Sequence, residues 1–236
     1  MKECELGGLR ARVTGGSDRE GGGDGPVVVL LHGFGAPGDD LVSLWRVLDV
    51  PRGTRFVFPE APVELEEYGY GARAWWRLDV AALEQAARSG QRPDRSNEVP
   101  EGLLSAHGRV LSLLDAVEAE FGVGAERIVL GGFSQGAMLS CDVALRSERP
   151  LAGVALLSST LLARAQWQAG LAERTALAFF QSHGRQDPLL PFAAAERLRD
   201  MLREAGCEVS WVEFNGGHEI PMSVLQGLGE FLHARL

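Results

Sequence analysis

The strongest constraint on the fold is an alternation of short apolar segments with longer stretches of helical periodicity. The apolar segments lie between turn residues and cover residues 27–31, 54–58, 127–131, 153–157, 176–181 and 208–214. Parallel strands are joined by crossover helices that cover both faces of the sheet, so such strands read as short runs that are apolar throughout. We therefore expect an α/β fold with a mostly parallel central sheet, helices on both faces and these strands mostly buried.

Two further patterns add helices and a hairpin to this plan. Residues 103–121 carry apolar side chains three, four or seven positions apart and end before Gly122, which suits a helix stop. Residues 193–205 show a similar pattern. Near the start, residues 3–6 and 9–13 flank a Gly-Gly pair, which predicts an antiparallel hairpin at the sheet edge.

The length favours one domain with one unusual connection. The chain has 236 residues, of which 45% are hydrophobic, and this fits a single α/β domain over residues 1–236. Residues 61–102 break the alternation, because they hold four aromatic residues and then a polar stretch. Connections of this length are usually functional or mobile. We expect this one to form a lid or a wall of a pocket.

Charge and cysteine usage restrict the partners and the compartment. Lys and Arg number 23 against 32 Asp and Glu, a formal net charge of −9, which disfavours nucleic acid and stable anchoring on an anionic membrane. The N-terminus lacks the apolar segment of a signal peptide. The three cysteines have no metal-ligand spacing and indicate free thiols in a reducing compartment. We expect a cytoplasmic protein without metal or cofactor that acts on a small molecule.

One short motif points to nucleophilic chemistry. Residues 132–136 read GFSQG, directly after the apolar segment 127–131 and before a helical pattern. A serine on so tight a strand-to-helix turn needs glycines on both sides, because neighbouring backbone must pack closely there. The turn would present the Ser134 hydroxyl at the carboxyl edge of the sheet, beside the N–H groups of the next helix. The alternative is a serine that only caps the helix.

Two more residues complete a candidate triad. A serine hydroxyl needs a base to take its proton, and on such folds an acid and then a histidine follow the serine along the chain. Asp187 lies in the turn after the expected strand 176–181, and His218 lies in the turn after 208–214. Both turns are expected at the edge that carries Ser134. The order and the placement predict Ser134, Asp187 and His218 as nucleophile, acid and base.

The remaining histidines compete for the role of base. His32 precedes the serine, and we expect it to shape the turn that holds the oxyanion loop. His183 should order the loop of Asp187 by hydrogen bonding. His107 and His233 lie in helical patterns, where we expect surface or half-buried positions and no part in the chemistry.

Acyl transfer also requires two backbone N–H donors for the developing oxyanion. The amide of Gln135, directly after the nucleophile, is one candidate. The other is the amide of Phe34 in the sequence LHGFG at residues 31–35, whose glycines let the backbone approach a substrate. An ordinary glycine-rich turn would fit the same residues.

Five motifs together resemble a known family. They are LHGFG at 31–35, FPEAP at 58–62, GFSQG at 132–136, HGRQDP at 183–188 and GH at 217–218. Along almost its whole length the chain resembles the phospholipase/carboxylesterase family of α/β-hydrolases, which includes acyl-protein thioesterases and bacterial carboxylesterases. The resemblance implies an α/β-hydrolase fold and metal-independent hydrolysis of esters or thioesters through an acyl-enzyme on Ser134.

The departures from the family pattern narrow this expectation. Residues 36–37 read AP where eukaryotic thioesterases tend to have an acidic residue, and WWRLD at 75–79 matches their Trp-Phe-Asp stretch only loosely. GHEIP at 217–221 is more similar to bacterial members. The sequence therefore does not support a protein depalmitoylase.

The substrate pocket is the least determined part of the site. The candidates are large apolar residues that could reach the catalytic edge: Tyr70, Trp75, Trp76, Leu189 and Leu190. Core packing is the alternative for them, and Arg73 and Arg77 are either anion-binding groups or solvated charges. We expect hydrolysis of carboxylic esters of small to medium acyl chain. Lysophospholipids or acyl thioesters as substrates, or a non-catalytic binding protein on the same fold, are the alternatives.

Overall fold

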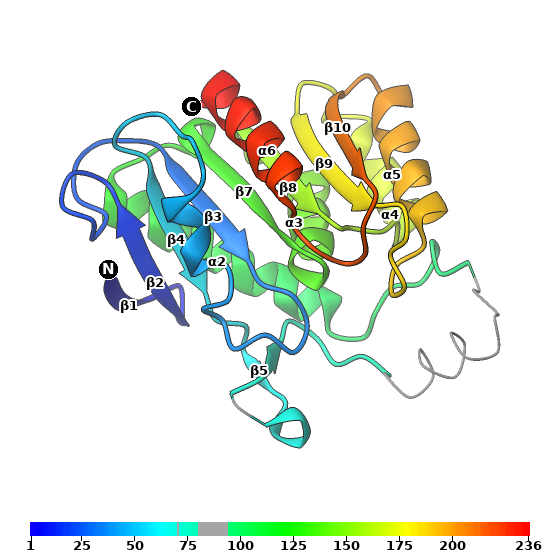
Figure 1. Ribbon diagram of the computed structural model, residues 1–236, viewed down its shortest axis with the longest axis horizontal. Coiled ribbons are helices and arrows are strands. Elements are labelled where there is room, and N and C mark those ends of the chain that lie inside the picture. The colour runs from blue at the N-terminus through cyan, green and yellow to red at the C-terminus, as the bar shows by residue number, and fades with distance from the viewer. Residues whose placement is uncertain (70, 80–93) are drawn as a thin grey trace.

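The computed structural model describes residues 1–69, 71–79 and 94–236. At its centre lies a twisted sheet with the strand order β1-β2-β4-β3-β7-β8-β9-β10 (Figure 1). Its parallel part consists of β3 (Val27–Leu31), β4 (Arg55–Pro59), β7 (Ile128–Phe133), β8 (Gly153–Leu157), β9 (Ala178–Gly184) and β10 (Glu208–Phe214). The expected mostly parallel sheet is confirmed.

The expected hairpin forms the other end of the sheet. Strands β1 (Lys2–Leu6) and β2 (Leu9–Gly15) pair antiparallel, and β2 continues antiparallel onto β4. Gly7 and Gly8 between them both have positive φ, 58° and 77°, as a tight two-residue hairpin turn requires. This hairpin is confirmed.

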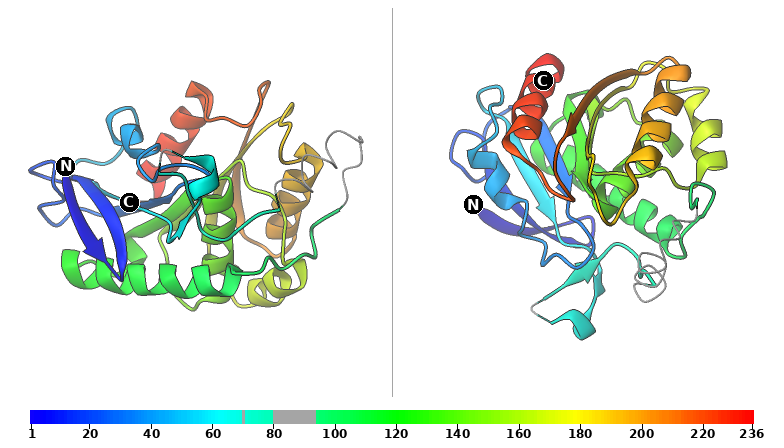
Figure 2. Two further views of the ribbon diagram at one scale, coloured as in Figure 1. Left: turned by 90° about the horizontal axis from the view of Figure 1, so that it is seen from below. Right: turned by 45° about the vertical axis from the view of Figure 1, so that its right-hand side comes forward.

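Helices cover both faces of the sheet, as expected (Figure 2). One face buries its apolar side chains against α2 (Leu103–Phe121), α3 (Gln135–Arg146), α4 (Arg164–Leu171) and α5 (Phe192–Glu204). The other face packs on the short helix η1 (Val42–Arg46) and on α6 (Met222–Arg235). Helix α2 has the expected bounds and ends at Gly122 with φ 57°.

The expectation that all parallel strands are mostly buried is wrong for β10. Its residues are half-buried or exposed, because β10 is the last strand of the sheet and pairs only with β9. Strands β7 and β9 run to Phe133 and Gly184, farther toward the carboxyl edge than the apolar segments indicated. This extra length carries the sheet into the region of the candidate site.

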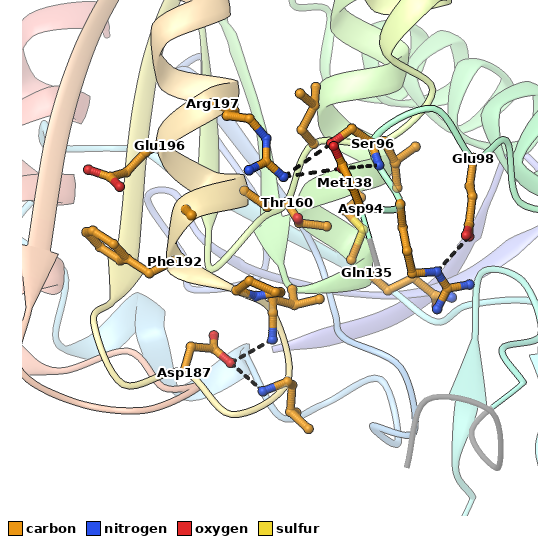
Figure 3. A pocket seen from close by; sticks show the side chains of 18 of the residues that line it. Asp94, Ser96, Glu98, Gln135, Met138, Thr160, Asp187, Phe192, Glu196 and Arg197 are labelled. Atoms are coloured by element: carbon orange, nitrogen blue, oxygen red, sulfur yellow. Dashed lines mark hydrogen bonds and ion pairs between the residues drawn. The ribbon is translucent and has the colours of Figure 1, made fainter. Parts of the chain in front are cut away.

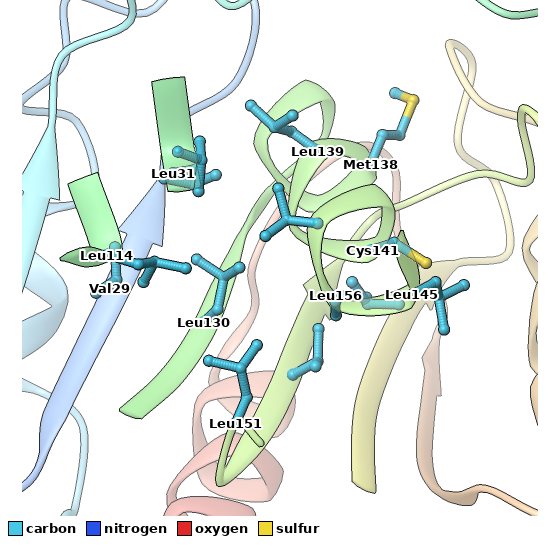
Figure 4. Packing of buried hydrophobic residues seen from close by; sticks show 14 of the residues in the cluster. Val29, Leu31, Leu114, Leu130, Met138, Leu139, Cys141, Leu145, Leu151 and Leu156 are labelled. Carbon is cyan, nitrogen blue, oxygen red and sulfur yellow. The ribbon is translucent and has the colours of Figure 1, made fainter. Parts of the chain in front are cut away.

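Helix α3 is the most deeply placed helix. Every residue from Gln135 to Leu145 is buried, and side chains such as Leu139 and Cys141 face the sheet or the neighbouring helices (Figure 4). A helix buried on all sides has little freedom to shift, because any movement would open cavities in a close-packed interior. The residue at its N-terminus is therefore held firmly.

A buried polar cluster ties α3 to its neighbours and corrects the expectation for His107. The His107 side chain is buried, and its Nδ1 donates a hydrogen bond to Asp142 Oδ2 at 2.8 Å. Trp167 Nε1 donates to Asp142 Oδ1 at 2.9 Å, and Arg146 approaches the same carboxylate at 3.1 Å. The helical pattern placed His107 on the surface or half-buried, whereas its Asp142 partner holds it inside. His233 is partly exposed and lies 3.3 Å from Asp49.

Part of the connection 61–102 forms a small β-structure beside the sheet. Strands β5 (Val63–Glu64) and β6 (Arg73–Ala74) pair antiparallel, and the short helix η2 (Glu66–Tyr68) lies between them in sequence. Leu65, Ala72 and Ala74 form its small apolar cluster, on which Phe34 packs. Figure 1 shows this unit projecting below the carboxyl edge of the sheet.

Candidate active site

Ser134 stands at the turn between β7 and α3. Its backbone has φ 54° and ψ −115°, which is a strained conformation for a residue with a Cβ. A Cβ at Gly132 would lie 2.5 Å from the carbonyl oxygen of Leu31, and one at Gly136 would lie 2.0 Å from the same oxygen. Only glycine fits at either position. The spacing of the motif therefore follows from close contact with the end of β3.

Asp187 and His218 meet through two loops at the same edge. The Arg185 and Gln186 amides donate to the carbonyls of Phe214 and Gly216 at 2.9 and 3.0 Å, which joins the loop after β9 to the loop after β10. His218 Nδ1 then donates to Asp187 Oδ2 at 2.7 Å. This bond leaves Nε2 as the ring nitrogen that can act as a base.

The environment of Asp187 favours its charged form. Its side chain is fully buried, and Oδ1 accepts hydrogen bonds from the amides of Leu189 and Leu190 at 2.8 and 2.9 Å. Burial by itself raises the pKa of Asp187, but the hydrogen bond from His218 and the two backbone N–H groups outweigh burial and hold the pKa below its ordinary value. An ionised carboxylate here can orient an imidazole and stabilise its cation.

The imidazole of His218 lies beside the elbow. Its ring packs on Phe133 with the centroids 4.7 Å apart, and Phe133 directly precedes Ser134. Within the described chain His218 and Ser134 Oγ form no hydrogen bond. In unliganded sites such bonds are often long and tighten only when substrate is bound. The structure thus joins the histidine to the acid and places the histidine ring against the residue before the serine.

His183 supports the loop of Asp187. It is fully buried, its Nε2 donates to the carbonyl of Leu190 at 3.0 Å, and the same nitrogen lies 3.4 Å from Asp187 Oδ2. Burial is the main cause that lowers the pKa of His183, so the ring is neutral at neutral pH. It contributes order to the loop and no charge.

The loop from residue 32 to 36 lies against the elbow. A Cβ at Gly33 would be 3.5 Å from Ser134 Cβ, so the amide of Phe34 belongs to backbone that is near the serine. The amide of Gln135 is the first of α3, where helix N–H groups have no acceptor within the helix. The structure therefore brings both proposed oxyanion donors close to Ser134.

His32 fixes the start of this loop. Its Nδ1 donates to the carbonyl of Gly33 at 2.8 Å, and its Nε2 accepts from the amide of Ala61 at 3.0 Å. A ring that donates with one nitrogen and accepts with the other is neutral. Burial lowers the pKa of His32 to about 4, which agrees with this assignment. The turn-shaping role expected for His32 matches these contacts.

A large cavity lies beside the residue that follows Ser134 (Figure 3). Its volume is about 670 Å³, and Gln135 and Asp187 are part of its wall. The apolar lining includes Trp76, Leu78, Met138, Leu161, Leu162 and Leu190. At a distance from Asp187, the Arg197 guanidinium lies 3.3 Å from Asp94 Oδ1 and 3.5 Å from Ser96 Oγ.

Some of the residues expected to contact substrate line the cavity, and others do not. Trp76, Leu189 and Leu190 line the cavity, and Leu189 is 68% exposed. Trp75 is not among the lining residues and is buried, with its indole Nε1 donating to the carbonyl of His32 at 2.9 Å. The hydrogen bond and the packing place Trp75 in the core. Tyr70 lies outside the described residues.

The two arginines beside the tryptophans have acidic partners. Arg73 lies 2.6 Å from Glu64 and 3.5 Å from Glu60, and Arg77 lies 2.8 Å from Glu67. Their charges are already compensated, which fits a structural role better than recognition of an anionic substrate group.

Met138 and Arg197 also line the cavity, although sequence reasoning did not select them. Met138 lies four residues after Ser134 on α3, so it shares a helix face with the nucleophile. That spacing is a signal that could have found it. Arg197 is part of the cavity wall because α5 passes the loop that contains Asp94. No sequence pattern shows this contact.

Neither a metal site nor a membrane span is found in the parts of the chain that the structure describes. No group of three or more His, Cys, Asp and Glu side chains there could hold a metal ion. None of the described helices is both long enough and apolar enough to cross a bilayer.

The chain is similar to known proteins over most of its length. A model of the phospholipase/carboxylesterase family matches residues 20–236. The chain belongs to this family. Acyl-protein thioesterase 1 of Neurospora crassa is 30% identical over 217 residues, which cover 89% of this chain and 86% of the relative.

Solved structures show the same fold. The crystal structure of esterase PE8 is 27% identical, with a TM-score of 0.82 over 97% of this chain and 99% of that chain. Acyl-protein thioesterase 2 of Zea mays is 21% identical, with a TM-score of 0.72 over 96% and 98%. The α/β-hydrolase fold is therefore confirmed, and family membership supports an esterase-type hydrolase.

Proposed function

We propose that this family member hydrolyses carboxylic esters through an acyl-enzyme formed on Ser134, with His218 as the base and Asp187 as the residue that orients it. The observation that carries the proposal is the 2.7 Å hydrogen bond between His218 and a fully buried Asp187 beside the strained Ser134 turn. A nucleophile, a base and an orienting acid in this arrangement are what acyl transfer to serine requires.

The first half of the reaction acylates the enzyme. His218 Nε2 takes the proton of Ser134 Oγ while Oγ attacks the acyl carbon, and the carbonyl oxygen becomes an oxyanion that the amides of Phe34 and Gln135 bind. Asp187 stabilises the imidazolium. His218 then gives its proton to the leaving alcohol as the carbon–oxygen bond breaks, which leaves the acyl group on Ser134.

The second half releases the acid. A water molecule gives a proton to His218 Nε2 and attacks the acyl carbon, which forms a second oxyanion in the same place. Ser134 Oγ then leaves and recovers the proton from His218. No metal or cofactor is needed for either half.

The cavity supports neutral acyl groups of small to medium size. Apart from Asp187, each charged residue of its wall has a partner of opposite charge: Asp94 with Arg197, Arg95 with Glu98, Arg185 with Glu213, and Glu196 with Arg199. Paired charges offer little to an ionic substrate, while Trp76, Leu78, Met138 and several leucines give the wall apolar side chains. A volume of about 670 Å³ is within the usual range for small-molecule sites.

Acyl thioesters are the second candidate substrate. The same serine chemistry expels a thiol as well as an alcohol, and the 30% identity to an acyl-protein thioesterase favours this alternative.

We also propose that residues 1–236 form one domain in which the connection 61–102 supplies a wall of the pocket, since Trp76, Leu78 and several residues between 94 and 100 contribute to the cavity.

The test is a series of p-nitrophenyl esters from acetate to palmitate, assayed with the wild type, Ser134→Ala and Ser140→Ala. Ser140 lies on the same helix with its hydroxyl bonded to the carbonyl of Gly136 at 2.8 Å, so Ser140→Ala is a matched control. We expect cleavage of the shorter esters by the wild type and the control, and none by Ser134→Ala.

Two results would change the assignment. A rate maximum at long chains, or faster cleavage of a thioester than of the ester with the same acyl group, would move the thioesterase and lysophospholipase alternatives to the front. Folded wild type that cleaves no ester and resists a fluorophosphonate would favour a non-catalytic binding protein on this fold.

A further inference from the structure

Residues 73–76 contact both halves of the proposed oxyanion hole, and we call this segment the brace. It lies in the connection 61–102, between β5 and the cavity wall. Trp75, for which the sequence left substrate contact and core packing open, is the centre of the brace and is buried. Its hydrogen bonds run to the loop that contains Phe34 and to the residue that follows Ser134.

The first set of contacts holds the Phe34 loop. The amide of Gly35 donates to the carbonyl of Arg73 at 2.8 Å, and the amide of Arg73 donates to the carbonyl of Ala36 at 3.0 Å. Trp75 Nε1 donates to the carbonyl of His32 at 2.9 Å, and the two rings lie 5.6 Å apart. The brace thus bonds to the loop on both sides of Phe34.

The second set of contacts holds the elbow. The side chain of Gln135 is buried, with 1% exposure, and its Oε1 accepts from the amide of Trp75 at 2.9 Å. Its Nε2 donates to the carbonyl of Trp76 at 2.8 Å. Both ends of the side-chain amide are therefore used, and the orientation of the amide group is fixed by the N–H and C=O that it meets.

We infer that the brace positions the two oxyanion donors relative to each other, with Trp75 and the side chain of Gln135 as positioning residues. The inference rests on the proposed function. One donor amide belongs to each of the two segments that the brace joins. An oxyanion hole works only when its donors are preorganised at the right separation, so a small displacement costs a large part of the rate.

The role of the Gln135 side chain is separate from that of the Gln135 backbone N–H. Any residue after the nucleophile supplies a backbone N–H, but only a side chain with a donor and an acceptor at this length satisfies both groups of the brace. Replacing Trp75 with Phe keeps an aromatic ring and removes the hydrogen bond to His32. Replacing Gln135 with Met keeps the backbone amide and removes both bonds to the brace.

The test compares an ester with its thionoester, in which sulfur replaces the carbonyl oxygen. Sulfur accepts hydrogen bonds weakly, so the ratio of the two kcat/KM values reports how well the oxyanion hole acts. We expect Trp75→Phe to lower kcat for the ester about 10-fold and Gln135→Met about 100-fold, with KM little changed. The ester to thionoester ratio should shrink in both variants.

Two controls separate the brace from general damage. Trp167→Phe also removes a buried indole hydrogen bond of 2.9 Å, to Asp142, and should leave both kcat and the ratio at wild-type values. Asp187→Asn should slow both substrates by a similar factor and so leave the ratio unchanged. The inference is overturned if Trp75→Phe and Gln135→Met keep the wild-type ratio, whether their rates fall or not.

A second measurement reads the brace without turnover. The Gly35 amide is bonded to Arg73, and we expect its hydrogen exchange to be faster in Trp75→Phe and Gln135→Met than in the wild type or Trp167→Phe. Unchanged hydrogen exchange of the Gly35 amide in both variants would overturn the inference that the brace positions the Phe34 loop. A wild type that cleaves no ester would instead overturn the proposed function, so the two failures are distinguishable.

Discussion

In two different regions of this molecule a histidine donates a hydrogen bond to a fully buried aspartate. At the carboxyl edge of the sheet, His218 donates to Asp187 at 2.7 Å, and in the helical layer His107 donates to Asp142 at 2.8 Å. Both carboxylates are fully buried, and their partners hold both pKa values below the ordinary value against the effect of burial. Geometry and charge alone do not tell the two pairs apart.

The difference lies in what surrounds each pair. Asp142 also bonds Trp167 and Arg146, so its pair is closed on all sides by helices and stabilises their packing. Within the described residues, Asp187 otherwise accepts hydrogen bonds only from the amides of Leu189 and Leu190, with His183 Nε2 3.4 Å away. Its histidine packs on Phe133, the residue before Ser134. In each pair one ring nitrogen of the histidine is bonded to the aspartate. We conclude that the surroundings of the other ring nitrogen decide which pair can act as a catalytic site.

The largest expected contrast concerns the two histidines. His218→Gln should lower kcat by about 10⁴- to 10⁶-fold, because Ser134 loses the base that takes its proton. His107→Gln, the matched change in the other pair, should leave kcat within about 2-fold of wild type, since nothing at the carboxyl edge is altered. Steady-state ester hydrolysis measures both rates. Equal losses of kcat in the two variants would contradict the conclusion that only the His218–Asp187 pair acts in catalysis.

The next contrast concerns the two aspartates. Asp187→Asn should lower kcat about 10⁴-fold, because the amide no longer fixes the tautomer of His218 or stabilises its cation. Asp142→Asn should keep wild-type kcat when assayed well below its melting temperature. An Asp142→Asn enzyme with a lower kcat at an unchanged folded fraction would show that the helical pair acts on the site.

For the free energy of unfolding, the pair in the helical layer should matter more than the pair at the carboxyl edge of the sheet. Asp142→Asn is expected to lower the free energy of unfolding by about 3 kcal/mol, because the Asp142 carboxylate is the shared acceptor for groups on three helices and Arg146 would lose its buried counter-charge. Urea unfolding followed by circular dichroism gives this value, with Ser140→Ala as a control on the same helix. A loss below about 0.5 kcal/mol would contradict a structural role.

The smallest effect is a dependence of that loss on pH. The folded-state pKa of Asp142 is lowered, so its stabilisation is complete above the unfolded-state value of about 3.9 and is lost as the pH falls through the lower folded-state value. The stability difference between wild type and Asp142→Asn should therefore shrink below about pH 4. A difference that stays constant into acid would mean that the charge of Asp142 contributes nothing.

Much of the fold could be predicted because its signals are local. The bounds of β3, β8 and α2 match the apolar segments and the helical period. The same reasoning missed the edge position of β10, whose sequence EVSWVEF mixes polar with apolar residues. Its apolar residues pack on both faces of the sheet, and its partial exposure follows from the missing neighbour on one side, which the strand's own sequence does not show.

The part of the site that could not be predicted depends on contacts between distant segments. Trp75 was a candidate for substrate contact because its segment could reach the catalytic edge, with core packing as the alternative. The structure places it in the core, bonded to His32, 43 residues away. His107 was expected at a surface or half-buried position because it lies in a helical pattern, and that pattern does not show its partner Asp142, 35 residues away. Pairings of this kind are made by tertiary packing and leave no periodic signal in the sequence.

The most direct test of the central claim is the rate of covalent labelling by a fluorophosphonate, read by intact-protein and peptide mass spectrometry. Labelling requires an activated serine and no particular substrate. The account predicts one adduct, on Ser134, at the same rate in wild type and His107→Gln and far more slowly in His218→Gln. An adduct on another residue, or equal labelling of wild type and His218→Gln, would contradict it.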